Sequence, residues 1–570
     1  MFNTLMIYIK WKQFLVMRFF CKKLYFEPNT DYMKNLIRST LFSMMWVSLA
    51  MAQGTPTDYL SADFHKERRD KVRNLLPPNT AVVLFANAER NRANDVDYIY
   101  HQDPNFYYLT GYKEPNAVLV LFSEPQTDAS GKQFNEIIYV QERNARAEQW
   151  TGKRLGVEGV KEKLGFDMVY NGKEFENFPV DFAKFDIVSF VDFKNDYRDQ
   201  SGNADLFDLI KTFKEKANYP SDYNPIRNEL YTMISADDGS KTEELVQTVE
   251  RYLNRFPDMR EDEFLNDFVN APNDDLRKEI KNKVLMVQQS HNLDSKVLPM
   301  VMAQLRETKT PEEMKLLKKA VEISAVGQIE VMKAMHPNMS ETEIQGVHEY
   351  VYKKYGAEYE GYPSIVGGGN NGCILHYIEN NKMEVGNDLV LMDLGAEYHG
   401  YTADVTRTIP ANGKFTPEQK AVYDIVYNAQ EAGIKASVVG APFQAPGRAA
   451  YQVVAEGLLK LGITKNEDET KIYFPHGTSH YLGLDVHDQG TYVPFQPNTV
   501  ITVEPGIYIP EGSACDKKWW GIAVRIEDDI LITENGPVNL SEMAPRTTEA
   551  IEAMMKQPSP LDDFKLPKLD

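Results

Sequence analysis

The sequence predicts an α+β protein with two domains, a mixed α/β domain followed by a domain in which helix pairs alternate with antiparallel strands. Two observations support this prediction. The chain has 570 residues, which is more than one hydrophobic core usually contains. Short apolar runs of strand length mix with helical patterns in the first half, whereas well-marked helix starts separate strand-like runs in the second half.

The composition is that of an ordinary soluble globular protein, with 42% hydrophobic and 26% charged residues. No interior stretch is long and apolar enough to span a bilayer, so we expect no stable membrane insertion. The net charge of −20 includes a segment, residues 1–52, that carries seven Lys or Arg and two Asp or Glu. The remainder therefore sits near −25, which argues against nucleic acid as a partner. Three cysteines are too few for a disulfide framework.

Residues 1–52 have the pattern of a leader with a signal peptide that starts at Met33. A basic stretch after Met33 precedes the apolar run Leu41–Ala50, and a small-x-small cleavage pattern ends at Ala52. The apolar run is too short for an uncleaved membrane anchor. We therefore expect cleavage after Ala52 and export to a periplasm or out of the cell. A cytoplasmic location is the alternative if this segment is not a signal.

The N-terminal α/β domain is expected to cover residues 53–235. Charged, helix-favouring sequence then follows, for example Leu276–Leu293, and we interpret residues 236–300 as a helical connection or insertion. Four apolar runs of the first domain have the length and composition of strands: Ala81–Phe85, Ala117–Phe122, Ile137–Val140 and Ile187–Val191.

The second domain is expected to cover residues 301–555, and residues 556–570, rich in Pro and Asp, are expected to form a loose tail. Its helix starts are marked by a hydroxyl residue that is followed three positions later by Glu or Gln, the signature of a capping box. This signature occurs before apolar periodic stretches at Thr310, Ser340 and Thr416.

Asp393 lies inside an apolar strand-like stretch, where an unpaired carboxylate would be costly to bury. The residues that follow predict a hairpin turning at His399–Gly400, which would pair Asp393 with Thr406. Asp404 would then lie on the same face as Asp393, diagonal to it and about 7–8 Å away at the backbone. Ligands that share a pair of metals can have this spacing. The alternative is a pair of solvent-facing aspartates on a half-exposed strand.

Three of the ten histidines, His476, His480 and His487, fall within twelve residues that also contain glycines. Single histidines are more often core or surface residues than ligands. A cluster favours a functional site, because imidazole suits both metal binding and proton transfer near neutral pH.

Two glutamates lie on further strand-like runs. Glu504 is followed by a proline, which favours an extended conformation at the glutamate. Alternation along the other run places Glu527 on the same face as Arg525. Either glutamate alone could be an exposed acid at the end of a strand.

Together, two aspartates, one histidine and two glutamates on separate strands predict a metal site. Oxygen ligands with one imidazole suit Mn²⁺, Co²⁺, Fe²⁺ or Zn²⁺. Five ligands are too many for one tetrahedral catalytic zinc, which keeps three ligands and an open position. They are enough for two metals if two carboxylates bridge them.

Five motifs of the second domain follow one another in an order that strongly resembles the pita-bread (creatinase/aminopeptidase-like) metallopeptidases. Within these, the sequence is most similar to the Xaa-Pro aminopeptidase (aminopeptidase P) family. The resemblance implies a C-terminal pita-bread catalytic domain that hydrolyses the bond between an N-terminal residue and a penultimate proline. The motifs are Met392–Gly395, Thr402–Thr408, His476–His480, Val503–Gly506 and Arg525–Asp528.

The first domain is similar to the N-terminal domain of the same family through Tyr98–Gln102, Phe106–Tyr112 and Glu114–Leu119. Two departures stand out. The charged stretch at 228–290 is longer than in compact bacterial members, and Tyr107 stands where close relatives tend to carry tryptophan.

The resemblance also implies the metal ligands. Asp393 would bind one metal, His480 and Glu504 would bind the other, and Asp404 and Glu527 would bridge the two. These are two divalent ions per subunit, with manganese as the expected metal.

His376, His476 and His487 match the histidines of the family that face the substrate, and Arg525 would position carboxylates and contribute to substrate binding. A hydroxide held between the two metals would attack the scissile carbonyl. His376 or His487 would stabilise the developing oxyanion, and Glu504 would carry a proton towards the leaving prolyl nitrogen. His376, His487 and Glu504 are therefore the expected catalytic residues.

The expected partners are peptides with proline at position 2, and the family resemblance implies a homo-oligomer. Two alternatives remain: a prolidase that cleaves only Xaa-Pro dipeptides, and a non-catalytic peptide-binding protein with the same fold. The serine at position 479 is more similar to the aminopeptidase motif than to that of a prolidase. The complete set of metal ligands argues against the non-catalytic alternative.

Overall fold

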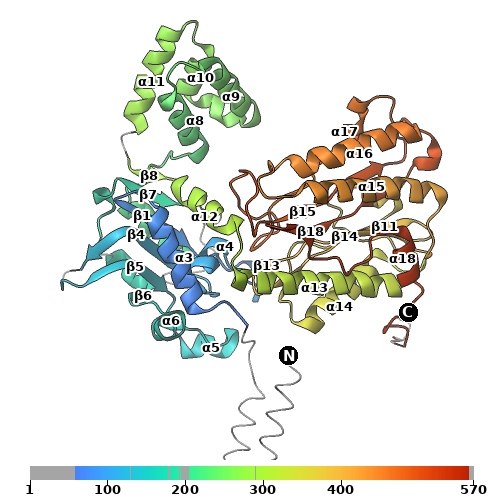
Figure 1. Ribbon diagram of the computed structural model, residues 1–570. Coiled ribbons are helices and arrows are strands. Elements are labelled where there is room, and N and C mark those ends of the chain that lie inside the picture. Colours follow the sequence, from blue (N-terminus) through green and yellow to red (C-terminus); the bar gives the residue numbers. More distant parts are fainter. Residues whose placement is uncertain are drawn as a thin grey trace, which may run out of the picture. The chain divides into compact units, whose positions relative to one another are not determined.

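The structure is a computed structural model of the chain (Figure 1). It describes residues 58–566 apart from 129, 178–179, 192, 194–204, 289–290 and 564–565. The chain divides into two compact units after Tyr59, and everything below belongs to the second unit. The leader predicted over residues 1–52 lies outside the described residues. Among the helices that the structure describes, none has the length and apolar character needed to cross a bilayer.

The first domain is built on a six-stranded sheet in the order β6-β5-β4-β1-β7-β8. The sheet is mixed, because β1 pairs antiparallel with β4 and parallel with β7. All four strands predicted from the sequence are confirmed, and β4 and β5 extend beyond their predicted ends. The strands are β1 Thr80–Phe85, β4 Val118–Thr127, β5 Gln133–Val140, β6 Val169–Asn171, β7 Ile187–Phe190 and β8 Leu293–Asp294, with the separate pair β2 Asn91–Ala93 and β3 Val96–Asp97.

Both faces of this sheet are buried. Successive side chains of a strand point to opposite faces, so Val82 and Leu84 enter one hydrophobic core whereas Ala81 and Val83 enter another. This explains why the predicted strands are continuous apolar runs instead of alternating ones. The helices of this part are α3 Ala62–Leu75, α4 Pro104–Thr110, α5 Ala145–Thr151, α6 Gly156–Leu164 and α7 Leu206–Lys216.

Four α-helices, which carry their own small core, lie between α7 and β8 in the sequence. The sequence predicts helical segments over 236–300, whereas the first of these four helices already begins at Pro225. Leu293, expected within the helical stretch, instead lies in β8, where it pairs with Val188 of β7. The helices are α8 Pro225–Ala236, α9 Thr242–Arg255, α10 Glu263–Asn270 and α11 Asp274–Gln288.

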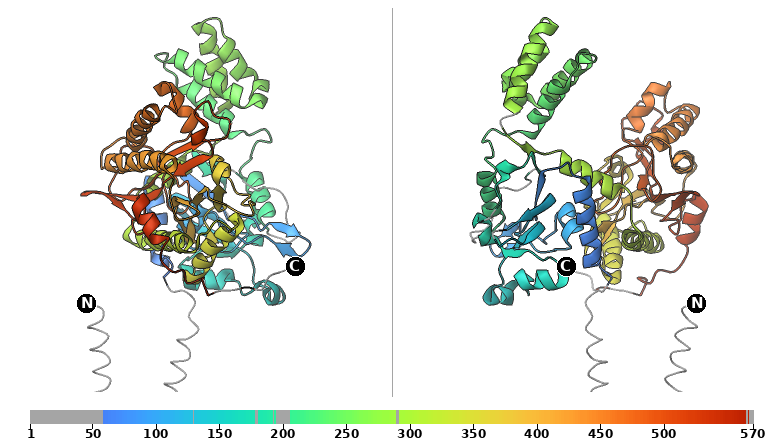
Figure 2. Two further views of the ribbon diagram at one scale, coloured as in Figure 1. Left: turned by 90° about the vertical axis from the view of Figure 1, so that its right-hand side faces the viewer. Right: turned by 60° about the vertical axis from the view of Figure 1, so that its left-hand side comes forward.

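The second domain contains two long helix pairs, α13 with α14 and α15 with α16, which lie on opposite sides of its strands (Figures 1 and 2). The predicted caps are confirmed. Thr310 and Thr416 form reciprocal capping boxes, and the Ser340 hydroxyl accepts a hydrogen bond from the N–H of Glu343. The helices are α12 Val297–Glu307, α13 Pro311–Ala334, α14 Glu341–Tyr355, α15 Pro417–Ala436, α16 Ala445–Leu461, α17 Thr470–Tyr473 and α18 Thr548–Met554.

The strands between these helices form four small antiparallel sheets, in the orders β10-β11-β14, β13-β12-β9, β15-β18-β19 and β16-β17. Their inward side chains join the large core that also includes the helix faces. The strands are β9 Tyr359–Glu360, β10 Ile365–Gly368, β11 Leu389–Asp393, β12 Ala396–Tyr398, β13 Tyr401–Thr402, β14 Thr406–Pro410, β15 Val500–Val503, β16 Gly506–Ile509, β17 Ile522–Arg525, β18 Asp528–Thr533 and β19 Gly536–Asn539.

Candidate active site

The hairpin predicted to turn at His399–Gly400 is confirmed. Tyr398 pairs with Tyr401, and the two turn residues have φ angles of 52° and 90°. A two-residue hairpin turn of this kind needs positive φ at both positions. Nδ1 of the buried His399 ring lies 2.6 Å from Oε1 of Glu358, and this contact helps to hold a conformation that glycine adopts more easily.

The register continues outward, so Asp393 pairs with Thr406 and Asp404 lies on the same face as Asp393. The two carboxylates converge on the hydroxyl of Tyr362. Its oxygen lies 2.6 Å from Oδ1 of Asp393 and 2.5 Å from Oδ1 of Asp404. A hydroxyl has one proton and can donate to only one of them. Burial, and then the charge of Asp393, raise the pKa of Asp404 in this arrangement.

Each of the four acidic candidates lies where a strand ends. β11 ends at Asp393, Asp404 lies between β13 and β14, Glu504 directly follows β15, and Glu527 directly precedes β18. The run expected as one strand around Glu527 is therefore two strands, because β17 pairs with β16 whereas β18 pairs with β15. The changes from one sheet to the next bring carboxylates from separate strands to one place.

His480 lies at the centre of this group. Its Nε2 is 3.5 Å from Oδ2 of Asp404 and 3.5 Å from Oε1 of Glu504. One potential ligand atom each from Asp404, His480 and Glu527 all lie within 4.8 Å of one another. Nδ1 of His480 lies 3.0 Å from the carbonyl oxygen of Tyr481, so Nδ1 carries the hydrogen. Nε2 is therefore the ring nitrogen that faces the acidic group, as in a metal-binding histidine.

Arg525 links Asp393 to other residues of the site through hydrogen bonds. Its Nη2 donates to Oδ2 of Asp393 at 2.5 Å, its Nη1 donates to the Tyr508 hydroxyl at 2.9 Å, and its Nε donates to Oγ1 of Thr406 at 3.3 Å. The Thr406 hydroxyl in turn donates to Oε2 of Glu527 at 2.6 Å. Two of the acidic candidates are thus oriented by one guanidinium group.

The surroundings shift the pKa values of the acidic side chains in different directions. Burial acts to raise the pKa of Asp393, but the charge of Arg525 and the hydrogen bonds from Tyr362 and Arg525 together outweigh it, and the pKa is lowered. Burial raises the pKa of Asp404, and the neighbouring charge of Asp393 raises it further. Burial and the charges of Asp404, Glu504 and Asp393 raise the pKa of Glu527 well above its ordinary value.

The pKa shifts of Glu504 and His480 also indicate that this place favours a positive charge. Burial raises the pKa of Glu504 to about 7, and the charge of Asp404 adds to the rise while that of His480 opposes it. Burial acts to lower the pKa of His480, but its hydrogen bond to Asp404 and the charges of Glu504 and Asp404 raise it to about 9. The group therefore stabilises a cation at this place. Buried carboxylates with one directed imidazole are a donor set that fits divalent metal ions.

His476 is held by a chain of hydrogen bonds that leads back to Arg525. Burial, and then the charge of Arg525, lower the pKa of His476 to about 4. Its Nδ1 lies 2.6 Å from the carbonyl oxygen of Gly477 and so carries the hydrogen, and its Nε2 accepts the Tyr508 hydroxyl proton at 2.8 Å. The imidazole is therefore neutral and fixed in orientation.

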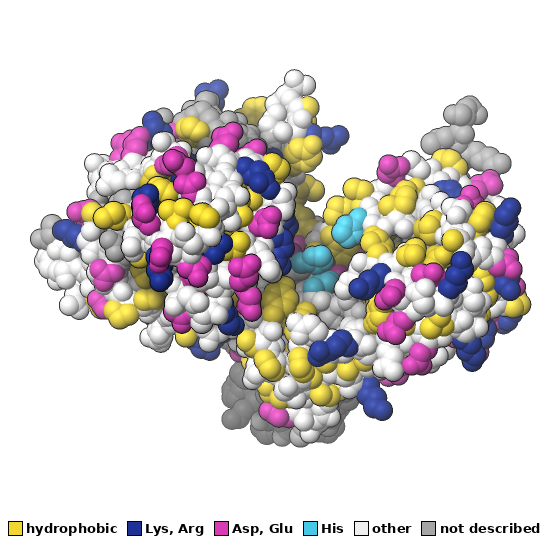
Figure 3. Space-filling view, turned by 90° about the horizontal axis from the view of Figure 1, so that it is seen from above, with side chains coloured by type: hydrophobic (Ala, Val, Ile, Leu, Met, Phe, Trp, Pro, Cys, Tyr) yellow, Lys and Arg dark blue, Asp and Glu magenta, His cyan; other side chains and the backbone are white. Residues whose placement is uncertain are grey.

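Two other candidate histidines lie nearer the surface, and histidine side chains gather in a hollow on the face shown in Figure 3. The ring centre of His487 is 4.2 Å from that of His480. Burial and the charge of His480 lower the pKa of His487. His376, which follows a short turn of helix at Gly369–Cys373, is exposed, and its charge acts on both His476 and His487.

Three residues of this site were not predicted from the sequence. Tyr362 precedes β10 and shows no local pattern that points to Asp393 or Asp404. Tyr508 could have been found, because strand alternation places it on the same side as Glu504, four residues earlier. Asp529, whose Oδ2 accepts a hydrogen bond from the backbone N–H of Asp404, is hidden among other acids of β18.

Comparison with known proteins gives two family matches. Residues 315–534 match metallopeptidase family M24, and residues 65–184 match the N-terminal domain of aminopeptidase P. The chain is 32% identical over 512 residues to the Xaa-Pro aminopeptidase of Escherichia coli, with 87% of this chain and 98% of that protein covered. It is 30% identical over 527 residues to human Xaa-Pro aminopeptidase 3, with 89% and 88% covered.

Solved structures agree with these matches. The aminopeptidase P of Escherichia coli with the inhibitor Pro-Leu superposes with a TM-score of 0.67 at 30% identity, covering 87% of this chain and 98% of that one. The proline aminopeptidase P II of Yersinia pestis gives a TM-score of 0.68 at 30% identity, with 87% and 99% covered.

Proposed function

Because this chain belongs to metallopeptidase family M24 and, within it, to the aminopeptidase P group, we propose that it is a Xaa-Pro aminopeptidase, which removes the first residue from peptides with proline at position 2. The fold predicted from the sequence, an α/β domain followed by a pita-bread domain, is confirmed by the same matches. As an M24 metallopeptidase, the protein depends on divalent metal.

One observation carries this proposal. Four acids from separate strand ends and one imidazole converge in a buried group that demands positive charge: Asp393, Asp404, His480, Glu504 and Glu527. We assign Asp393 to one metal, His480 and Glu504 to the other, and bridging roles to Asp404 and Glu527. Two bound divalent ions, with Mn²⁺ as the proposed species, would polarise the scissile carbonyl and lower the pKa of a water molecule.

The side chains around this group have distinct proposed tasks. Glu504, with its pKa raised to about 7, would accept a proton and pass it to the leaving prolyl nitrogen. His376 and His487, at the exposed side, would donate hydrogen bonds to the substrate carbonyl as negative charge develops there. The neutral His476, held through Tyr508 by Arg525, would contact the proline side of the substrate. A prolyl peptide bond has no N–H, so this contact cannot depend on one.

The test is a peptidase assay on metal-loaded protein with Xaa-Pro, Xaa-Pro-Xaa and Xaa-Ala-Xaa peptides. The proposal expects release of the first residue from Xaa-Pro-Xaa, little turnover of Xaa-Ala-Xaa, and loss of activity with a chelator. Cleavage of the Xaa-Pro dipeptide alone would establish a prolidase instead. If the fully metal-loaded protein hydrolysed none of these peptides, the proposed catalysis would be contradicted.

Three further expectations from the sequence belong with this proposal. We propose export with cleavage after Ala52, which N-terminal sequencing of the mature protein tests. We propose a homo-oligomer, which light scattering tests. We also propose three parts close to the predicted ranges 53–235, 236–300 and 301–555, with a tail at 556–570. Their boundaries would lie before α8 and before α12, because boundaries at 235 and 300 would cut these helices. Limited proteolysis tests this division.

A further inference from the structure

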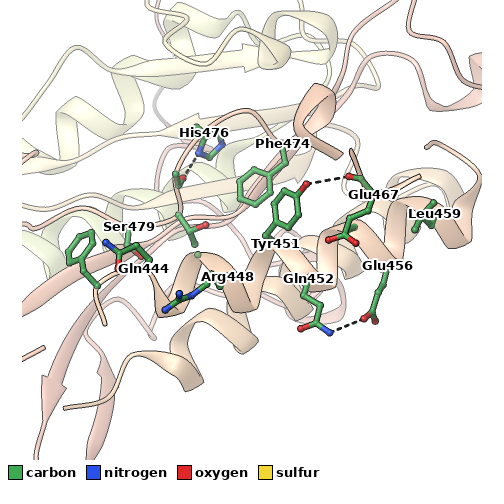
Figure 4. Close-up of a pocket in the computed structure, with 15 residues that line it drawn as sticks. Gln444, Arg448, Tyr451, Gln452, Glu456, Leu459, Glu467, Phe474, His476 and Ser479 are labelled. Carbon is green, nitrogen blue, oxygen red and sulfur yellow. Dashed lines mark hydrogen bonds between the residues drawn. The ribbon is translucent and has the colours of Figure 1, made fainter. Parts of the chain in front are cut away.

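A groove of about 680 Å³ runs along helix α16 beside the candidate active site (Figure 4). We call it the α16 groove. Its size is within the range of protein sites that bind small ligands or peptide segments. The residues that matter here are Gly447, Arg448 and Tyr451 on α16, and Phe474, His476 and Ser479 on the opposite side.

His476 belongs to both the groove and the site. Its Nδ1 lies 3.8 Å from Oε2 of Glu504, while its ring lines one end of the groove. From there aromatic rings lead away from the acidic group. The Phe474 ring meets the His476 ring edge-on with centres 5.2 Å apart, and the Tyr451 ring stacks on that of Phe474 at 6.4 Å. The groove is therefore continuous with the place where the scissile bond would lie.

We propose that the α16 groove binds the part of the substrate peptide that follows proline. This inference rests on the proposed function. An aminopeptidase of this kind has one residue on the amino side of the scissile bond, so a longer substrate must extend on the leaving side. His476, which we place against the proline side, marks where the groove begins.

The length of the groove sets the length of the peptide segment. Its α16 positions run from Gly447 to Leu459, which is about 18 Å at 1.5 Å per helical residue. An extended peptide advances about 3.3 Å per residue. The groove therefore matches about five extended residues after proline.

Polar groups of the groove are available to such a segment. Arg448 is exposed and forms no ion pair with any acid that the structure describes. Glu456 and Glu467, farther along the groove, likewise pair with no Lys or Arg of the described part of the chain. These charges favour an acidic residue near proline and a basic residue farther on.

A blocking substitution tests the proposal. A Cβ added at Gly447 would meet only Thr478, at 3.6 Å, so Gly447→Leu fits the helix and projects into the groove. The matched control is Gly346→Leu, at an exposed position inside α14 where an added Cβ meets nothing within 4 Å. The measured quantity is the ratio of kcat/KM for a seven-residue Xaa-Pro peptide to kcat/KM for Xaa-Pro-Xaa.

Gly447→Leu should lower this ratio about tenfold, a loss of about 1.4 kcal/mol of transition-state binding, while Gly346→Leu should leave it as in the wild type. An unchanged ratio in a Gly447→Leu protein that melts like the wild type would overturn the proposal. If the wild type cleaved neither peptide, the proposed function itself would fail, so the two failures are distinguishable.

A charge reversal gives an independent measurement. Arg448→Glu should invert the preference between two seven-residue peptides that carry Glu or Lys at the second position after proline. Lys460→Glu, at an exposed position on the same helix and outside the groove, makes the same change in net charge. Equal preferences in Arg448→Glu and Lys460→Glu would contradict the role of Arg448.

Discussion

The guanidinium group of Arg525 lies 2.5 Å from Oδ2 of Asp393, and both side chains are almost fully buried. The two residues are 132 positions apart in the sequence and reach each other from β17 and β11. Because the same guanidinium group also holds Tyr508 and Thr406, its shape matters as well as its charge.

Arg525→Lys should therefore lower metal affinity about 10–100-fold, although the charge is kept. A lysine has one point of contact and cannot hold Asp393, Tyr508 and Thr406 together. Isothermal titration calorimetry of metal-stripped protein with Mn²⁺ measures this change. Lys518→Arg, at an exposed site nearby in the sequence, is the control. Wild-type affinity in Arg525→Lys would show that charge alone suffices.

Asp404→Asn should have opposite effects on the stability of metal-free and metal-loaded protein. Burial and the charge of Asp393 raise the pKa of Asp404, so its ionised form destabilises the fold when no cation is present. Removal of that charge should raise the melting temperature of the stripped protein at neutral pH and abolish the further rise caused by metal. Differential scanning calorimetry with and without Mn²⁺ measures both. A stripped variant that melts well below the stripped wild type would contradict this account.

Asp488, next to His487 in the sequence, is expected to stabilise the protein strongly. It is buried, and Arg306 and Lys309 both contact it, the latter at 3.0 Å. Asp488→Ala would leave two cations buried without their partner, which should cost about 3–5 kcal/mol of the free energy of unfolding. Denaturant unfolding measures this loss. The control is Asp424→Ala, a surface pair with Lys420, for which we expect a loss of less than about 1 kcal/mol.

Two buried histidines, His65 and His348, should each contribute a loss of stability as pH falls from about 6.5 towards 4. Burial lowers the pKa of His65 to about 4 and that of His348 to about 3. The unfolded chain takes up protons at these histidines below about 6.5, while the folded chain does not, so low pH favours unfolding by up to about 1.4 kcal/mol per pH unit for each. His348→Leu should reduce this slope in chemical denaturation from pH 7 to 4, and the exposed His336→Leu is the control. A slope identical in His348→Leu and wild type would contradict the assignment.

Local rules predict a large part of this fold. The hairpin register follows from a two-residue turn at His399–Gly400, because strand pairing has a period of two and the count outward to Asp393 leaves no freedom. The capping boxes at Thr310 and Thr416 follow in the same way from residues three positions apart.

Long-range pairing is what the sequence could not predict. The residues around Leu293 in the sequence favour a helix, and only the pairing of Leu293 with β7 makes it part of a strand. Tyr362 reaches Asp393 and Asp404 because the chain before β10 passes them in space, and nothing nearby in the sequence indicates this. The break between Arg525 and Glu527 likewise depends on which strands pair on either side.

The most direct test of the proposed dinuclear site is the metal stoichiometry of chelator-stripped protein titrated with Mn²⁺, with peptidase activity followed in parallel. We predict two ions per chain, activity that returns as they bind, and fewer than two ions in Glu527→Ala. A wild-type chain that binds no ion in this group of side chains, or that hydrolyses Xaa-Pro-Xaa at full rate after complete metal removal, would contradict it.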